Sequence, residues 1–418
     1  MKAHIITIGD ELLIGQTVNT NAGFIGEKLT ALQIEVVKTS VVGDDDEQIT
    51  HEFEEGSKNA DIIIVTGGLG PTHDDVTRSC VVRYFDTELV KNEDVLDDVK
   101  EIFEARGRKT SKVNEDQALV PKIADVIRNT KGTAPGYWIE KNDKIYIVMP
   151  GVPYEMKEMM TESVMPRLQE LLGEKKEYVL IKNLLTTGVP ESSLFEMLGD
   201  LDSLLNGAKL AFLPNQYGVK LRITVRAESE EESHNKLTEL EQKIRSIAGR
   251  YIYGKDGETL EEVVARLLTD RSVKISVAES CTGGLIAHRL TNVSGSSTYF
   301  ERGVVAYSNA AKVELLKVDE DLIQKYGAVS LEVARLMAEG VKAVSGTDIG
   351  IAVTGIMGPT GATQDKPVGL VYIGICDDKI CTAKEFRFGD DRELNKDRTS
   401  QSALEMLRRN ILGIPYDE

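Results

Sequence analysis

The chain has few cysteines, no long apolar run and no excess of positive charge, and each shortage excludes a class of protein. Only four cysteines occur in 418 residues, without a CxxC pair, so we expect neither a structural zinc site nor a disulfide framework. No apolar run approaches the roughly 18 residues of a membrane-spanning helix, and the first residues hold no signal-peptide core. We therefore predict a cytoplasmic protein without a membrane partner.

The charge balance is acidic. Lysine and arginine number 50 against 68 aspartates and glutamates, which gives a net charge of −18. Nucleic-acid binding through a broad face depends on clustered cations, so we expect no nucleic-acid partner. A glycine-rich turn can still hold one phosphate through its backbone amides, and nucleotide binding is therefore not excluded.

The length predicts two or three domains. Residues 1–172 alternate short apolar runs with helical patterns, which is typical of a doubly wound α/β domain with a mainly parallel sheet. Residues 173–253 follow a β-α-β-β-α order and predict a small α+β module with a helix at 230–248. Residues 254–418 return to an α/β pattern and end in a helix at about 390–412. The expected fold class is multi-domain α/β.

Three glycine loops of the first domain follow predicted strands. They are GDELLIG at 9–15, TGGLGPTHDDVT at 66–77 and MPGVP at 149–153. Open α/β sheets bind ligands beyond the carboxyl ends of their strands, and glycine lets backbone amides approach an oxyanion. The residues predicted to bind a nucleotide there are Gly9, Glu11, Gly67, Gly68, Gly70, Pro71, Thr72, Pro150 and Gly151.

Carboxylates cluster in the same loops. Asp44, Asp74 and Asp75, with Asp10 and Glu11, form a set suited to a Mg²⁺-type ion that bridges phosphates. The alternative is that the glycines only form tight turns and the acids only cap helices. Three loops in sheet order favour the functional interpretation.

A serine, a tyrosine and a lysine in the last domain predict a hydroxyl nucleophile with a proton-handling partner. The segment GSSTYFERGVVAYSNAAK at 295–312 places Tyr307 ten residues after Ser297, and Lys312 five residues later. Serine needs a neighbour that removes its proton, and lysine does so only when burial or nearby positive charge lowers its pKa. We predict Ser297 as nucleophile with Lys312 and Tyr307 moving the proton. Cys281 is the rival nucleophile.

Each of these three residues also has an ordinary structural interpretation. Ser297 can be a turn residue, Tyr307 a strand aromatic whose hydroxyl reaches solvent, and Lys312 a surface lysine of a helix. Arg289 and Arg302 are expected in structural salt bridges.

The first-domain loops carry a resemblance. The segments GDELLIGQTVNTN, VVGDDDEQI, TGGLGPTHDDVT and MPGVPYEM resemble the loops of the molybdopterin-binding (MoaB/MogA) fold, in the form found at the N-terminus of the CinA family. This resemblance implies a homodimeric, nucleotide-handling domain, which in some members hydrolyses the pyrophosphate of ADP-ribose with a divalent metal. In the family pattern, Asp75 matches the acid after the glycine loop, and Asp44 matches the acid after the second strand.

The last domain resembles the CinA C-terminal domain, the family of nicotinamide mononucleotide (NMN) amidohydrolases. The motifs are AESCTGG, GSSTYFERGVVAYSN, GAVS, GIMGPTGATQDKPVG and FGDDRELNKDR. The implied reaction converts NMN and water to nicotinate mononucleotide and ammonia, in pyridine nucleotide salvage and without a cofactor. A substrate phosphate is suited to a helix-opening turn or an arginine fork. The residues expected to bind substrate are Ser280, Thr282, Gly283, Gly284, Thr354 and Arg392.

The remaining features qualify this resemblance. Met357 stands where family members more often carry a small residue, so it is expected to narrow the pocket. The middle module resembles the KH-like insert of long CinA proteins but has no GxxG loop, so we expect a structural or dimer-forming role. The alternatives to an enzyme of nucleotide salvage are a non-catalytic competence or DNA-damage adaptor and a molybdopterin-binding protein.

Overall fold

The chain folds into two compact units, Met1–Val179 and Leu180–Glu418. The computed structural model describes residues 1–72, 75–105, 107–173 and 178–416. Across these ranges, no helix combines the length and the apolar character that crossing a bilayer requires.

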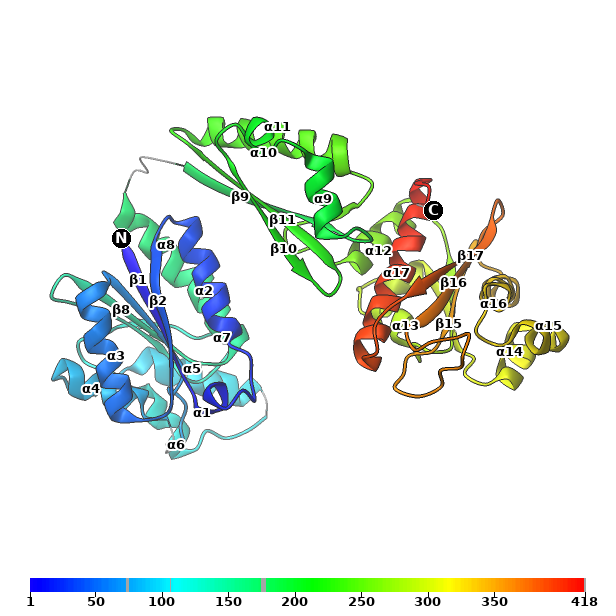
Figure 1. Cartoon of the computed structure of the whole chain (residues 1–418). Coiled ribbons are helices and arrows are strands. Elements are labelled where there is room, and N and C mark those ends of the chain that lie inside the picture. Colours follow the sequence, from blue (N-terminus) through cyan, green and yellow to red (C-terminus); the bar gives the residue numbers. More distant parts are fainter. Residues whose placement is uncertain (73–74, 106, 174–177, 417–418) are drawn as a thin grey trace. The chain divides into compact units, whose positions relative to one another are not determined.

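A six-stranded sheet forms the centre of the first unit (Figure 1). Its strands are β1 (Lys2–Ile8), β2 (Glu35–Val42), β3 (Ile62–Thr66), β6 (Asp125–Ile127), β7 (Gly136–Lys141) and β8 (Lys144–Met149). The order is β2-β1-β3-β8-β7-β6. Strands β2, β1, β3 and β8 pair in parallel, whereas the β8–β7 and β7–β6 pairs are antiparallel. A separate pair joins β4 (Leu89–Lys91) and β5 (Leu119–Pro121).

Helices cover both faces of this sheet. The helices of this unit are α1 (Asp10–Leu13), α2 (Thr20–Ala31), α3 (Asp46–Asn59), α4 (Thr77–Phe85), α5 (Glu93–Ala105), α6 (Lys112–Glu115), α7 (Pro153–Met159) and α8 (Met165–Leu172). Phe53 packs with Ile63 on one face, and Ile25 packs with Ile62 and Ile64 on the other. Successive strand residues point to opposite faces. Because both faces are covered, β3 is buried along its whole length. The predicted doubly wound domain is confirmed.

The second unit begins with a four-stranded sheet, β10-β11-β9-β12, against three helices. The elements are β9 (Tyr178–Thr186), α9 (Glu191–Leu198), α10 (Leu201–Leu205), β10 (Lys209–Asn215), β11 (Gly218–Ala227), α11 (Glu230–Ala248) and β12 (Ile252–Lys255). Leu221 and Ile223 pack with Ile244 of α11, and Ser229 caps that helix. The helix predicted at 230–248 is confirmed. The expected domain boundary at 253–254 falls inside β12.

A five-stranded sheet, β14-β13-β15-β16-β17, completes the second unit. Its strands are β13 (Ile275–Glu279), β14 (Phe300–Val305), β15 (Ile349–Gly355), β16 (Leu370–Cys376) and β17 (Cys381–Arg387). Strands β14, β13 and β15 pair in parallel, whereas the β15–β16 and β16–β17 pairs are antiparallel. The carboxyl ends of β13, β14 and β15 therefore lie at one edge of the sheet, which is where ligands of such sheets bind.

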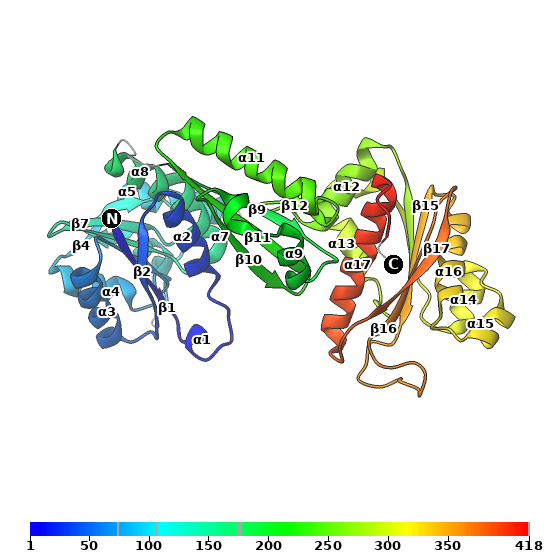
Figure 2. The same ribbon diagram turned by 45° about the horizontal axis from the view of Figure 1, so that its top comes forward.

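Helices cover both faces of this second sheet (Figure 2). On one face lie α12 (Leu260–Asp270), α13 (Leu285–Thr291) and α17 (Arg392–Leu412), and on the other α14 (Asn309–Leu316), α15 (Glu320–Tyr326) and α16 (Leu331–Ser345). Helix α17 also contacts the four-stranded sheet's module, because Arg408 donates to the carbonyl of Arg250 at 2.6 Å. Buried Glu405 accepts hydrogen bonds from Arg408 and Arg409, which fixes both guanidinium groups.

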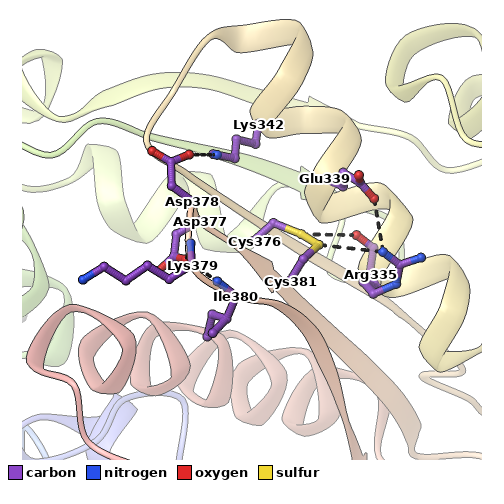
Figure 3. Close-up of a disulfide and its surroundings, with 9 residues drawn as sticks. All are labelled: Arg335, Glu339, Lys342, Cys376, Asp377, Asp378, Lys379, Ile380 and Cys381. Carbon is purple, nitrogen blue, oxygen red and sulfur yellow. Dashed lines mark hydrogen bonds and ion pairs between the residues drawn. A yellow bond between two sulfur atoms is a disulfide. The ribbon is translucent and has the colours of Figure 1, made fainter.

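A disulfide joins Cys376 and Cys381 across the hairpin of β16 and β17 (Figure 3). The two cysteines are directly opposite partners in the antiparallel pair. We expected no disulfide framework because no CxxC pair occurs, and for this one bridge the expectation is wrong. Hairpin pairing places residues five positions apart side by side, which a search for close cysteine pairs overlooks.

Candidate active site

The ends of neighbouring strands bring Ser280 and Lys312 together in the second unit. Strand β13 ends at Glu279, and the Ser280 N–H donates to the carbonyl of Val353 on β15 at 3.1 Å. Lys312 lies on α14, which Ser308 caps. The Lys312 Nζ is 3.1 Å from the Ser280 Oγ. At this separation a hydroxyl and an amine can exchange a proton.

Lys312 is suited to accept a proton because it is buried, with 1% of its surface exposed. Burial lowers the pKa of Lys312. Its Nζ also contacts the carbonyl oxygens of Ala306 at 2.9 Å and Tyr307 at 3.2 Å. A neutral amine has two N–H donors and one lone pair. The two carbonyls match the donors, and the lone pair is left for the hydroxyl of Ser280.

The pair lies in a cavity of about 320 Å³. Its walls come from the ends of β13 and β15, the first residues of α14 and α17, and the loop 356–361. Among the described residues that line it, Arg392 is a cation and none is a carboxylate. In a chain of net charge −18, this local charge favours an anionic ligand.

Arg392 and Tyr307 lie together at this cavity. Arg392 Nη1 donates to the Gly358 carbonyl at 2.7 Å, and its Nη2 lies 3.5 Å from the Tyr307 hydroxyl oxygen. Thr354 also lines the cavity, and its hydroxyl donates to the Ala328 carbonyl at 2.8 Å. The structure therefore brings the predicted residues Ser280, Tyr307, Lys312, Thr354 and Arg392 to one site.

Ser297 does not belong to this group, and its predicted pairing with Lys312 is wrong. It lies in the 3-10 turn Ser296–Thr298, before strand β14, whereas Tyr307 and Lys312 follow that strand. The register pairs Ile275 with Phe300 and Glu279 with Val305, so Ser297 and Ser280 lie at opposite ends of the sheet. Spacing along the chain conceals this, because an extended strand of six residues separates the two ends by about 20 Å.

The predicted phosphate turn at 282–284 is also corrected. The buried carboxylate of Glu279 already accepts the Gly284 N–H at 2.9 Å and the Thr282 hydroxyl at 2.6 Å. The Gly283 N–H donates to the Ser280 carbonyl at 3.2 Å. The amides of Gly283 and Gly284 are therefore engaged within the protein. The sequence signal that was overlooked is Glu279 itself, an acid at the last position of an apolar strand and just before a glycine turn.

Cys281 and Met357 both line this cavity. Burial raises the pKa of the Cys281 thiol to about 12, so it stays protonated at neutral pH and the rival nucleophile is not favoured. Met357 is 3% exposed and lines the cavity, in keeping with the expected narrowing.

Arg289 forms the expected ion pair, with Glu261 at 2.6 Å, whereas Arg302 donates to the carbonyl of Val344 at 3.2 Å instead.

The three predicted loops of the first unit meet at a cavity of about 510 Å³. The predicted residues that line it are Gly9, Glu11, Asp44, Gly67, Gly68, Gly70, Pro71, Asp75, Pro150 and Gly151. Thr72 is not among them. Its N–H and its hydroxyl donate to Asp75 Oδ2 at 2.9 and 2.6 Å. Asp74 lies outside the described residues. The convergence of the loops at the carboxyl ends of the strands follows the sheet order.

The acids of this cavity repel one another. Burial raises the pKa of Asp44, and the charges of Asp10, Glu11 and Asp75 add to the rise. In the part of the chain that the structure describes, no three acidic, histidine or cysteine side chains converge as metal ligands. The predicted divalent-metal site also includes Asp74, which lies outside the described residues, so this site stays a prediction.

Asn21 is a residue of this cavity that the sequence did not single out. Its side chain is buried, with 6% exposure, and its Nδ2 donates to the Gly151 carbonyl at 2.7 Å. Its Oδ1 has no hydrogen-bond partner among the described residues. A buried acceptor without a partner at a cavity suits a donor supplied by a ligand, such as a hydroxyl.

Family models match three consecutive parts of the chain. Residues 4–170 match the "Probable molybdopterin binding domain", residues 181–254 the "Damage-inducible protein CinA KH domain" and residues 257–411 the "CinA C-terminal domain". Among solved structures, the protein CinA from Thermoplasma acidophilum is 35% identical, with a TM-score of 0.37, over 40% of this chain and 96% of that one.

Full-length relatives agree with these matches. A competence-damage inducible protein of Caldicellulosiruptor saccharolyticus is 44% identical over 413 residues, which cover 99% of this chain and 100% of the relative. The protein of the same name from Caldicellulosiruptor bescii is 45% identical over 412 residues, with the same coverage. With both cavities and all three domain types in place, the chain belongs to the CinA family of competence/damage-inducible proteins.

Proposed function

We propose that the second unit hydrolyses the carboxamide of NMN to nicotinate mononucleotide and ammonia. The observation that carries the proposal is the 3.1 Å contact between the Ser280 Oγ and the buried Nζ of Lys312. The match to the CinA C-terminal domain over 257–411 supports it, because that stretch contains the whole cavity.

Ser280 takes the place of Ser297 as the nucleophile. Neutral Lys312 accepts the hydroxyl proton while the Ser280 Oγ bonds to the carboxamide carbon. The C–N bond then breaks, and the proton passes from Lys312 to the leaving nitrogen, giving ammonia and an ester on Ser280. Water attacks this ester with its proton moving to Lys312. The C–O bond to Ser280 breaks, and Lys312 returns its proton to restore the serine hydroxyl. The carboxylic acid leaves and loses its remaining proton to solvent, giving the carboxylate.

The charge of the cavity supports a phosphate-bearing substrate. Arg392 uses Nη1 on the Gly358 carbonyl, which fixes the guanidinium plane at the cavity wall. Its other N–H groups are suited to a phosphate oxygen, for which arginine is geometrically matched. Tyr307 lies against the same guanidinium group and is 62% exposed, so its ring offers a surface for the substrate.

The test is to incubate the purified chain with NMN and to quantify nicotinate mononucleotide and ammonia. We expect the two products in equal amounts from the wild type, and none above background from Lys312→Ala. Nicotinamide riboside, which lacks the phosphate, should be a poorer substrate. A folded wild type that releases no ammonia contradicts the proposal and favours the adaptor role.

We also propose a nucleotide site in the first unit, with the pyrophosphate of ADP-ribose as its substrate. The unpartnered Oδ1 of Asn21 in a cavity walled by glycine loops supports this second site. Calorimetry should detect binding of ADP-ribose, and Asn21→Ala should weaken it about tenfold, as expected for a lost hydrogen bond. Preferential binding of a molybdopterin would instead favour the molybdopterin-binding alternative.

A further inference from the structure

We infer that Glu279 is a positioning residue, whose buried carboxylate holds the turn that presents Ser280 and the backbone N–H groups of Cys281 and Thr282 to the substrate. This inference rests on the proposed function, since it assigns the parts of the same site. It concerns a residue that never touches the reacting atoms but fixes those that do.

Glu279 is enclosed by donors from the chain that follows it. It is 1% exposed. Its Oε2 accepts hydrogen bonds from the Thr282 hydroxyl at 2.6 Å, the Gly284 N–H at 2.9 Å and the Ile286 N–H at 3.1 Å. Its Oε1 accepts the Ala287 N–H at 2.8 Å. One side chain thus ties together the whole segment from the strand end to the first turn of α13.

A carboxylate is the side chain that this arrangement requires. Three backbone N–H groups and one hydroxyl converge on it, and all four are donors. An ionised carboxylate only accepts, whereas a glutamine side chain presents an NH₂ group on one side. Hydrogen bonds to a charged acceptor are also stronger than those to a neutral one. Replacing the charge therefore weakens or breaks contacts that define the turn.

The turn that Glu279 holds contains two backbone amides, those of Cys281 and Thr282, that are available for the reaction. The Ser280 N–H donates to Val353, and the Gly283 N–H donates to the Ser280 carbonyl. No backbone carbonyl among the described residues takes the N–H groups of Cys281 and Thr282. Both N–H groups face the sulfur of Cys281, which is a weak acceptor and belongs to a residue that lines the cavity. Two amides that no backbone carbonyl takes, directly after a nucleophile, are suited to stabilise the oxyanion of the tetrahedral intermediate.

The first test compares Glu279→Gln with the wild type. We expect kcat for NMN to fall about 100-fold with KM changed less than about threefold, because a misaligned nucleophile and oxyanion hole act mainly on the transition state. A second readout is the rate at which phenylmethylsulfonyl fluoride labels Ser280, followed by mass spectrometry. In that step the Ser280 oxygen bonds to sulfur, fluoride leaves and Lys312 takes the proton. The labelling rate should fall in parallel with kcat.

The labelling readout separates this inference from the proposed function. If the wild type does not hydrolyse NMN but Ser280 is still labelled, the substrate assignment fails and Glu279 remains testable. Wild-type labelling rates in Glu279→Gln would overturn the inference, whichever amide is the substrate.

Matched variants distinguish positioning from folding. Thr282→Val removes the hydroxyl donor to Glu279 at nearly constant volume and should lower kcat about tenfold, whereas Thr282→Ser keeps the donor and should recover most of that loss. Ser276→Ala, on the same strand, removes buried hydrogen bonds to Val341 and Thr347. It should reduce stability without changing kcat. If Glu279→Gln does not fold, equal kcat values in the two Thr282 variants would overturn the inference.

Discussion

Lys312 combines a buried position with a task that depends on its charge. Only the neutral amine can accept the Ser280 proton, and burial lowers the pKa of Lys312 below the ordinary lysine value of about 10.4. Activity should therefore be complete above the lowered pKa and should be lost as pH falls through it. We predict that kcat/KM for NMN rises with pH to a plateau, with its inflection below the ordinary pKa of lysine. The measurement is a pH profile of ammonia release.

Lys312→Arg gives the control for this profile. Arginine keeps a positive charge at all accessible pH values and cannot act as the base. It should abolish activity across the whole range. A wild-type profile that is flat, or that falls as pH rises, would rule out a neutral lysine as the proton acceptor.

Arg392 is the residue that should decide affinity for the phosphate. Its charge-assisted hydrogen bonds to an anion are expected to contribute about 1.5–3 kcal/mol, which corresponds to a KM increase of about 10- to 150-fold in Arg392→Ala. Nicotinamide riboside, without a phosphate, should be affected far less. Arg302→Ala is the matched control, because that arginine donates to a carbonyl on the protein. An unchanged KM in Arg392→Ala would place the phosphate elsewhere.

Helix α11 offers a prediction at the scale of the element. Ser229 caps the helix by accepting the Glu232 N–H, which satisfies one of the unpaired donors at its start. Ser229→Ala should lower the free energy of unfolding of the second unit by about 1 kcal/mol. Ser246→Ala, in the exposed last turns of the same helix, should change it by less than about 0.5 kcal/mol. Equal effects in a denaturant titration would show that the cap contributes nothing.

The elements also show what the sequence could predict and what it could not. Helix α11 and strand β3 were predictable because their periodicity and apolar runs reflect burial on local faces. The grouping of Ser280 with Lys312 was not, because it depends on the register of β13 against β14. Ser297 and Ser280 have the same side chain. They differ in position, because one precedes β14 and the other follows β13, at opposite ends of the sheet. The Cys376–Cys381 bridge and the enclosure of Glu279 were missed for the same reason, since both arise from pairing and turn geometry.

At the scale of the whole molecule, every residue that lines the Ser280 cavity belongs to the second unit. That unit also has its own buried clusters, including Leu268, Leu407 and Val341. We predict that a fragment of residues 180–418 folds and retains kcat/KM for NMN within about threefold of the full chain, as expected when no distant group enters the site. Ammonia release by both proteins checks this. A folded but inactive fragment would mean that the first unit completes the site.

The most direct test of the account compares Ser280→Ala with Ser297→Ala in ammonia release from NMN. The two changes are chemically identical, and the two serines lie at opposite ends of the same sheet. We expect Ser280→Ala to lose at least about 1,000-fold in kcat, as loss of a nucleophile does, and Ser297→Ala to keep the wild-type rate. Full activity in Ser280→Ala, or loss of activity in Ser297→Ala alone, would contradict it.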